Sequence, residues 1–124
     1  MPVDPIRTIE MIREEDDRYG IDAYLFVLDG VAHTVGKLPE PRHVSGQELL
    51  EGIRELARER FGPMTRTVLE HWGVNRCEDF GEIVFNLVDA GLLGKTEDDS
   101  REDFAGGYDF AQAFDAFEIE DDEG

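Results

Sequence analysis

The feature that most constrains the fold is a succession of apolar residues at helical spacing between residues 45 and 93, interrupted by glycine and proline. Apolar side chains recur three or four residues apart in three consecutive stretches, which predicts three helices that each bury one face. Gly62 and Pro63 end the first stretch, Gly73 ends the second and Gly91 ends the third, because these residues stop a helix or favour its C-terminal turn. Helices of this kind bury their apolar faces by packing against one another.

The first of these three helices has the clearest start. Ser45 and Glu48 match the S-x-x-E capping box, in which each side chain accepts a hydrogen bond from the backbone N–H of the other residue. The helix is expected to begin after Ser45 and to end before Gly62. Its predicted buried face consists of Leu49, Ile53, Leu56, Ala57 and Phe61.

The segment EHWGVNRCEDFGEIVFNLVDAGLL, residues 70–93, has the outline of a helix-turn-helix. A short helix ends at Gly73, a turn follows, and a longer helix spans residues 78–91. Residues 92–93 are expected to start a strand, and DFAGGYDF, residues 103–110, is expected to return as a second strand. We therefore predict a mainly α fold: a helical domain with a winged-helix-like three-helix unit and a small β-hairpin.

Two further helices are expected near the N-terminus. Asp4 suits an N-cap and Pro5 suits the first helical position, so the first helix is predicted to run to about residue 18 and to stop at Gly20. The segment AYLFVL, residues 23–28, could be a buried strand by itself. Over a longer window the apolar residues fall at helical spacing and Asp22 can act as a cap, which favours a helix of about residues 22–37.

The chain length of 124 residues is typical of one domain. We predict a single helical domain over residues 1–114, with N-terminal helices in 1–41 and the winged-helix-like unit in 42–110. Residues 115–124 are expected to form an acidic tail.

The net charge of -18 limits the classes of partner. Residues 97–124 alone carry twelve acids and one base. Such a charge repels phosphate backbones and anionic lipid surfaces, and it favours a cationic partner. An acid-rich chain with only two lysines, Lys37 and Lys95, is also expected in high intracellular salt, where self-repulsion is screened.

No targeting or membrane segment is expected. No apolar run approaches the roughly 18–20 residues that span a bilayer, and the N-terminal MPVDPIRTIE lacks the order of a signal peptide. The single cysteine, Cys77, excludes an internal disulfide. We predict a cytoplasmic protein without a membrane partner.

Direct binding of nucleic acid is disfavoured by the second helix of the helix-turn-helix. A helix that reads DNA offers hydrogen-bond donors to base edges and tolerates nearby phosphates. Only Asn86 on the polar side of residues 78–91 suits base reading, and the carboxylates beside it would meet phosphates as like charges. The residues expected to face outward are Glu78, Asp79, Glu82, Asn86 and Asp89.

No motif for a metal, a cofactor or catalysis is present, so none is predicted. Zinc sites need close ligand pairs such as C-x2-C, which are missing here. EDDSRED, residues 97–103, lacks the ligand order of an EF-hand loop, and Ser45 is better explained as a helix cap than as a nucleophile beside His43. One alternative stays open: an enzyme or metal-dependent factor whose site combines scattered carboxylates with His43 or His71.

Aromatic residues are concentrated at the C-terminal end among acids, and they allow two interpretations. They could form the last layer of the core, or they could belong to an acidic–aromatic amphipathic segment that docks in a groove of a partner. The candidate partner-contact residues are Phe104, Tyr108, Phe110, Phe114 and Phe117.

Four motifs, HVSGQELLEGIR, GPMTRTVLEHWG, DFGEIVFNLVDAGLL and YDF, resemble an uncharacterised bacterial family of small acidic proteins associated with planctomycetes and verrucomicrobia. The resemblance covers residues 20–114 and implies no activity, cofactor or site residue. We therefore expect a non-enzymatic protein–protein interaction module that binds a protein partner or associates with itself. An acidic mimic of nucleic acid is a further alternative, which would need carboxylates spaced like phosphates along one edge.

Overall fold

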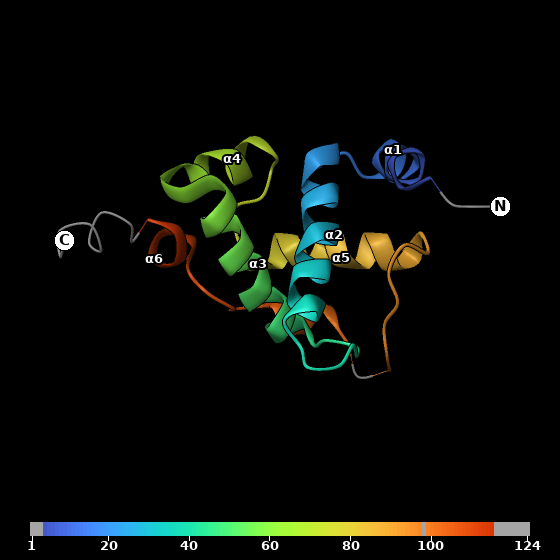
Figure 1. The fold of residues 1–124 in the computed structure, drawn as a ribbon. Helices are drawn as coiled ribbons and strands as arrows, with labels where there is room; N and C mark the ends of the chain where they lie inside the picture. The colour runs from blue at the N-terminus through green and yellow to red at the C-terminus, as the bar shows by residue number, and fades with distance from the viewer. Residues whose placement is uncertain (1–3, 98, 116–124) are drawn as a thin grey trace, which may run out of the picture.

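The computed structural model describes residues 4–97 and 99–115, and these form a mainly helical fold (Figure 1). The described residues contain no strand, and none of their helices is both long and apolar enough to cross a membrane. The helices are α1 (Pro5–Glu15), α2 (Ile21–Gly36), α3 (Gly46–Phe61), α4 (Thr65–His71), α5 (Cys77–Asp89) and α6 (Phe110–Phe114), with short 3₁₀ helices η1 (Gly62–Met64) and η2 (Arg101–Phe104).

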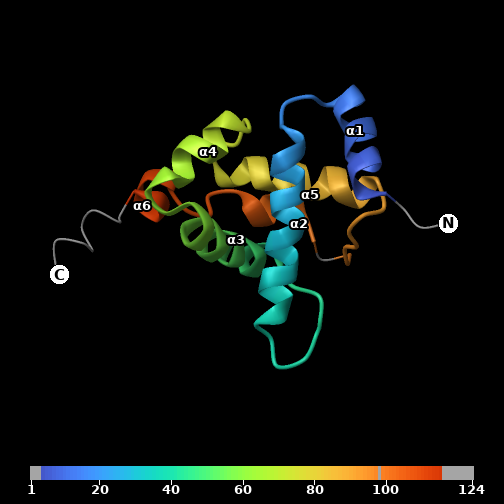
Figure 2. The same cartoon turned by 45° about the horizontal axis from the view of Figure 1, so that its top comes forward.

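Helix α2 crosses α5, and α3 packs beside α2, while α1 and α6 lie at opposite ends of the molecule (Figures 1 and 2). The core between these helices contains fully buried side chains from almost every element. The largest of them are Tyr19, Tyr24, Phe80, Phe114, Ile9, Ile53, Leu69, Ile83 and Leu87.

Residues 23–28 are part of helix α2, as the longer apolar pattern predicted. Small residues let α2 approach α3 closely. A Cβ on Gly52 would lie 1.8 Å from Thr34 Oγ1, and a Cβ on Gly30 would lie 2.8 Å from Ile53 Cγ1. The Thr34 hydroxyl donates to the Gly30 carbonyl over 2.8 Å, so this buried polar group is satisfied within α2.

The predicted helix caps are mostly confirmed. The Asp4 carboxylate accepts from the Ile6 amide over 3.1 Å, and the Ser45–Glu48 capping box is complete, with bonds of 2.9 and 3.1 Å. Asp22 is an exception, because α2 begins at Ile21 and therefore places Asp22 in its first turn.

Helix α1 ends at Glu15, earlier than predicted, because Asp16 adopts an extended backbone with φ of -142°. The connection from Asp16 to Gly20 then runs against the end of α4. The Gly20 amide donates to the Trp72 carbonyl over 3.1 Å, and Gly73, at φ +91°, lies so close that a Cβ would be 2.3 Å from the Arg18 carbonyl oxygen. Gly73 thus ends α4, as predicted. Because it has no side chain, it also lets the Arg18 carbonyl approach closely.

The predicted β-hairpin is wrong for the described residues, so the three-helix unit has no wing there. Ser100 and Asp103 form a second capping box, which starts the 3₁₀ helix η2 where a returning strand was expected. Phe104 then inserts between two helices whose facing residues are glycines. A Cβ on Gly46 would lie 3.1 Å from the Phe104 ring, and a Cβ on Gly81 would lie 2.9 Å from Phe104 Cβ.

Candidate functional site

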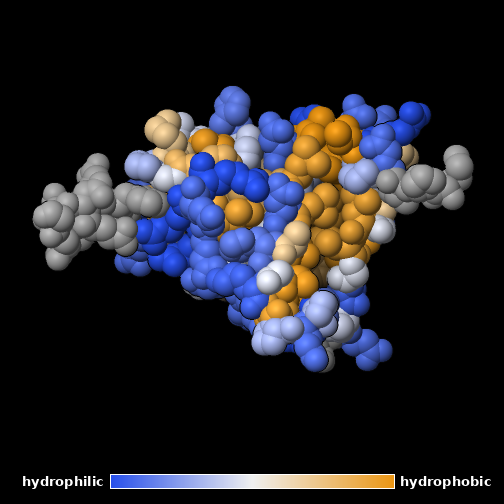
Figure 3. Space-filling view, viewed as in Figure 1, coloured by the Kyte–Doolittle hydropathy of each residue, from blue (hydrophilic) through white to orange (hydrophobic). Residues whose placement is uncertain are grey.

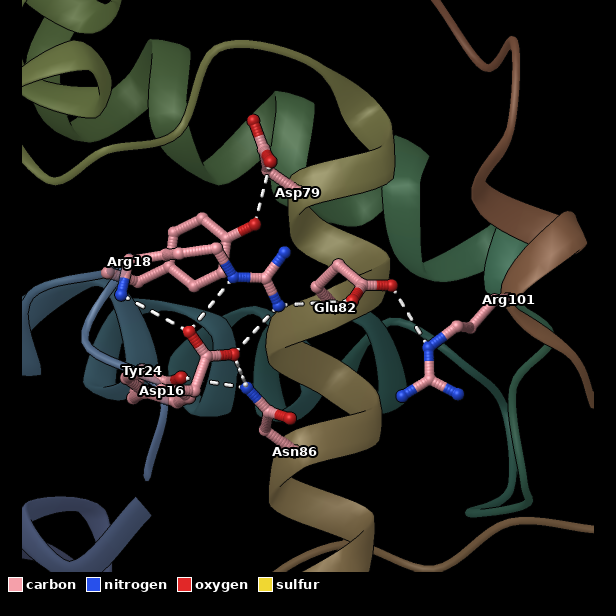
Figure 4. A network of polar contacts seen from close by, with 8 residues as sticks. Asp16, Arg18, Tyr24, Asp79, Glu82, Asn86 and Arg101 are labelled. Atoms are coloured by element: carbon pink, nitrogen blue, oxygen red, sulfur yellow. Dashed lines mark hydrogen bonds and ion pairs between the residues drawn. The ribbon is translucent and has the colours of Figure 1, made fainter. Parts of the chain in front are cut away.

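A network of polar side chains joins the α1–α2 connection to one side of α5 (Figure 4). The Asp16 carboxylate accepts two bonds from the Arg18 guanidinium, at 2.9 and 2.7 Å, and one from Asn86 Nδ2 at 3.0 Å. Asn86 Nδ2 also lies 3.0 Å from the Tyr24 hydroxyl oxygen, to which it donates. One side chain of α5 therefore holds both the connection and α2.

The same network continues toward the start of α5 and to η2. Arg18 also donates to Glu82 over 3.1 Å, and the other Glu82 oxygen accepts from Arg101 Nε over 3.0 Å. The Tyr19 hydroxyl donates to Asp79 over 2.7 Å. Asp79 and Glu82 thus each bind a neighbouring segment.

The network shifts the pKa values of Asp16 and Tyr19 in opposite directions. Hydrogen bonds from the Arg18 guanidinium hold the pKa of Asp16 well below its usual range, with a further contribution from Asn86. Burial raises the pKa of Tyr19, and the Asp79 carboxylate adds to that increase. Asp16 is therefore ionised and Tyr19 is a neutral donor.

The network changes the interpretation of the outward side of α5. Asp79, Glu82 and Asn86 were expected to face solvent, but they are half-buried against the α1–α2 connection, whereas Asp89 is exposed. The sequence reasoning missed their partners because Asp16, Arg18 and Tyr19 are sixty or more residues away along the chain. The only feature of the sequence that pointed to a shared contact was the spacing of Asp79, Glu82 and Asn86, which places them on one face of α5. The expected absence of nucleic-acid binding stays a prediction.

A groove of about 570 Å³ lies between α1 and the C-terminal half of α5, next to the network. Its apolar part includes Met11, which is 61% exposed, and the half-buried Ile12. Its polar part is acidic, and none of the described residues that line it is basic. The groove is lined by Thr8, Met11, Ile12, Glu14, Glu15, Asp16, Asn86, Asp89 and Ala90.

A second, more apolar cavity of about 250 Å³ lies between α2, the start of α3, α5 and the 93–104 segment. Figure 3 shows a broad apolar surface on the face of the molecule that includes α2. The apolar residues that line the cavity are Val31, Val35, Val44, Leu49, Val84, Phe85, Val88, Leu93 and Phe104. Its polar lining consists of Arg42, His43, Ser45, Lys95, Asp99 and Asp103.

The structure places His43 at this cavity, where its Nε2 lies 2.6 Å from Asp99 Oδ2. Hydrogen bonds from the Thr96 amide and from His43 outweigh the opposing effect of burial and hold the pKa of Asp99 below its usual value. Ser45 Oγ accepts from the Glu48 amide, as its capping role predicts. The His43–Asp99 pair therefore holds Asp99 beside the residues that lead into α3.

His71 does not join His43 in any cluster. It is exposed at the last position of α4. In residues 4–97 and 99–115 no three His, Cys, Asp or Glu side chains are grouped so as to hold a metal ion. Cys77 is buried, burial raises the pKa of its thiol, and its Sγ accepts from the Tyr108 amide over 3.3 Å.

The candidate partner-contact aromatics pack inward. Phe104, Phe110 and Phe114 are buried, and Tyr108 is half-buried with its hydroxyl donating to the Leu50 carbonyl over 2.9 Å. The Phe110 and Phe114 rings meet edge to face at 5.0 Å. This is the arrangement that the core interpretation predicted. Phe117 lies outside the described residues, and a role of these aromatics in partner contact stays a prediction.

Comparison of the chain with protein-family models, with curated proteins and with solved structures finds no match.

Proposed function

We propose that this protein is a non-enzymatic interaction module, and that the groove between α1 and α5 binds a basic amphipathic segment of another protein. One observation carries the proposal: the groove combines the exposed Met11 and the half-buried Ile12 with four carboxylates and, among its described lining residues, no base.

The apolar contribution is centred on α1. Met11 is one of the few large apolar side chains that are more than half exposed, and Ile12 beside it is half-buried. An unbranched, polarizable methionine adapts to different partner surfaces, which is why methionine is common at such sites. A partner's apolar residue placed on Met11 and Ile12 would remove this surface from water.

The charge of the groove selects the class of partner. Glu14, Glu15 and Asp89 are exposed, whereas Asp16 is already paired with Arg18. Lysine or arginine side chains on a partner helix would complement these three exposed acids. A second copy of this chain would bring another -18 charge toward the groove, so self-association is opposed by long-range repulsion at low salt.

The enzyme alternative has weaker support. It needs carboxylates gathered around His43 or His71, and the described residues bring only Asp99 into ion-pair contact with His43. Asp99 is engaged by the Thr96 amide at 2.8 Å and acts as a structural acceptor.

The proposal can be tested with a designed helical peptide of leucine and lysine and with a second peptide in which every lysine is replaced by glutamate. Chemical-shift perturbation should localise binding of the lysine peptide to α1 and the end of α5, and calorimetry should show affinity that falls with added salt. The glutamate peptide should not bind.

The chain offers a matched pair of controls. Met11 and Met64 are 61% and 56% exposed, and Met64 lies in η1, away from the groove lining. Met11→Lys should weaken binding of the lysine peptide about tenfold or more, since it removes apolar contact and adds a like charge, whereas Met64→Lys should leave the affinity within about twofold. Equal losses in both variants, or shifts spread over the whole surface, would show that net charge alone attracts the peptide.

A further inference from the structure

The cavity beside His43 carries an inference that is separate from the interaction groove. We propose that this cavity binds a small apolar monocarboxylate, with the apolar body between α2 and α5 and the carboxylate at Lys95. The cavity and the α1–α5 groove share no lining residue.

The size and lining of the cavity determine the body of the ligand. Its volume of about 250 Å³ lies between an engineered cavity of ~150 Å³ that binds benzene and the ~300 Å³ lower bound of drug-sized sites. Branched aliphatic side chains from α2 and α5 and the rings of Phe85 and Phe104 form its walls. Such walls favour one aromatic ring or a short branched chain over a long acyl chain.

The charges at the cavity determine the head group. Its two acids are already engaged: Asp99 accepts from the Thr96 amide at 2.8 Å and Asp103 accepts from the Ser100 amide at 3.1 Å. Arg42 is paired with Glu48 at 2.8 Å. Asp99 also lies 2.6 Å from His43 Nε2, so both acids and Arg42 already have a polar partner within the protein.

Lys95 is the cation that remains available. Its ammonium lies 5.5 Å from the centre of the Phe85 ring, which itself lines the cavity. Among the described residues, no carboxylate makes an ion pair with Lys95. In a chain with only two lysines and thirty acids, an ammonium held at an apolar cavity without an acidic partner complements a carboxylate. A cationic ligand would meet Lys95 and Arg42 as like charges.

The test uses 3-phenylpropionate, its neutral amide and the amine 3-phenylpropylamine as probes with the full-length protein. Titration followed by amide and methyl chemical shifts should give saturable binding of 3-phenylpropionate in the millimolar range or tighter, with the shifts centred on Val31, Val84, Val88 and Lys95. The carboxylate should bind about tenfold more tightly than the amide, and the amine should bind most weakly.

The two lysines provide the matched comparison. Lys95→Met should abolish the preference for carboxylate over amide, whereas Lys37→Met, which removes the lysine that pairs with Glu55 on α3, should retain it. Val88→Phe should reduce binding of all probes by filling the cavity. Absence of saturable shifts in the wild-type protein would overturn the site, and equal affinity for carboxylate and amide would overturn the role of Lys95. Because Lys95 is exposed, its variant tests the proposal even if Val88→Phe fails to fold.

Discussion

The two terminal helices of the described chain, α1 and α6, are attached in different ways. Helix α1 has eleven residues and buries only Ile9, whereas α6 has five residues and buries Phe110, Ala113 and Phe114. The shorter helix therefore has the larger apolar anchor. Helix α1 is held by the single buried side chain of Ile9 and, where it ends, by the Asp16 carboxylate in the polar network.

This difference shows that the length of these two helices does not determine how many apolar side chains each of them buries. Aromatic packing holds α6 through contacts that do not change with pH, such as the edge-to-face contact of Phe110 and Phe114. Ionic hydrogen bonds hold the end of α1, and they depend on the ionisation of Asp16. Because α1 is not drawn fully into the core, a groove remains between it and α5.

Removing the apolar anchor of α6 should have the largest effect. Phe114 is fully buried, so Phe114→Ala is expected to lower the free energy of unfolding by about 3–5 kcal/mol, through lost burial and the cavity left behind. Urea denaturation measures this change. Gln112→Ala, at an exposed position of the same helix, should change it by less than about 0.5 kcal/mol. A small loss for Phe114→Ala would mean that α6 is not anchored by its aromatic side.

The apolar anchor of α1 should come second. Ile9→Ala is expected to cost about 2–3 kcal/mol, because Ile9 is fully buried but α1 can shift to close part of the space. Ile6, which is 50% exposed in the same helix, provides the control: Ile6→Ala should cost less than about 1 kcal/mol. Urea denaturation and amide exchange of α1 would check both values. If the two variants were equally stable, α1 would not depend on its buried face.

The ionic attachment of α1 should come third and should depend on pH. Asp16→Asn is expected to lower the free energy of unfolding by about 1–2 kcal/mol at neutral pH, since it weakens charge-assisted bonds to Arg18 and Asn86. The folded protein depresses the pKa of Asp16. The stabilisation is therefore present above the unfolded pKa of about 3.9 and is lost as the pH falls below it toward the folded value.

Urea denaturation of the Asp16→Asn variant and the wild type at several pH values tests this sign. The difference between them should shrink as the pH is lowered toward 3 or so. Asp17→Asn, which changes the exposed neighbouring carboxylate, is the control and should show a much smaller difference. A loss for Asp16→Asn that is constant with pH would indicate a packing effect rather than an ionic one.

The smallest effect is expected for the ionic contact of α6. Arg66 lies 2.6 Å from Asp115, but both side chains are well exposed, and exposed ion pairs contribute about 0–1 kcal/mol. Arg66→Gln should therefore change the free energy of unfolding less than any of the preceding anchor variants, measured by urea denaturation at low and high salt. If Arg66→Gln lowered the free energy of unfolding as much as Asp16→Asn does, the ionic contacts of α6 and α1 would be equally important.

The local features of the chain were largely predictable. The caps at Asp4 and Ser45, the glycine ends at Gly73 and Gly91, and the helical assignment of residues 23–28 follow from backbone chemistry and apolar period. Residues 92–93 and 103–110 were misassigned because a short apolar pair and an aromatic repeat fit a strand as well as a packed turn. The burial of Phe104 depends on space left by two glycines on different helices, which no local pattern reports.

The candidate sites were less accessible to prediction than the helices. The acidic balance indicated a cationic partner, yet the groove exists because α1 stops at Glu15 and the next residues turn back against α5. The pairing of His43 with Asp99 and the position of Lys95 over Phe85 join segments 56 and ten residues apart along the chain. Composition cannot indicate such pairings.

The amino-acid order alone determined where helices form and which of their faces are apolar, because capping, glycine conformation and periodicity act over a few residues. Packing decided which polar residues of α5 face solvent. Asp79, Glu82 and Asn86 are on the hydrophilic side of their own helix, but their environment is set by a connection folded back from the other end of the chain. The physical reason is that a charged side chain near the surface forms hydrogen bonds with the polar groups that the packed helices place within reach of it.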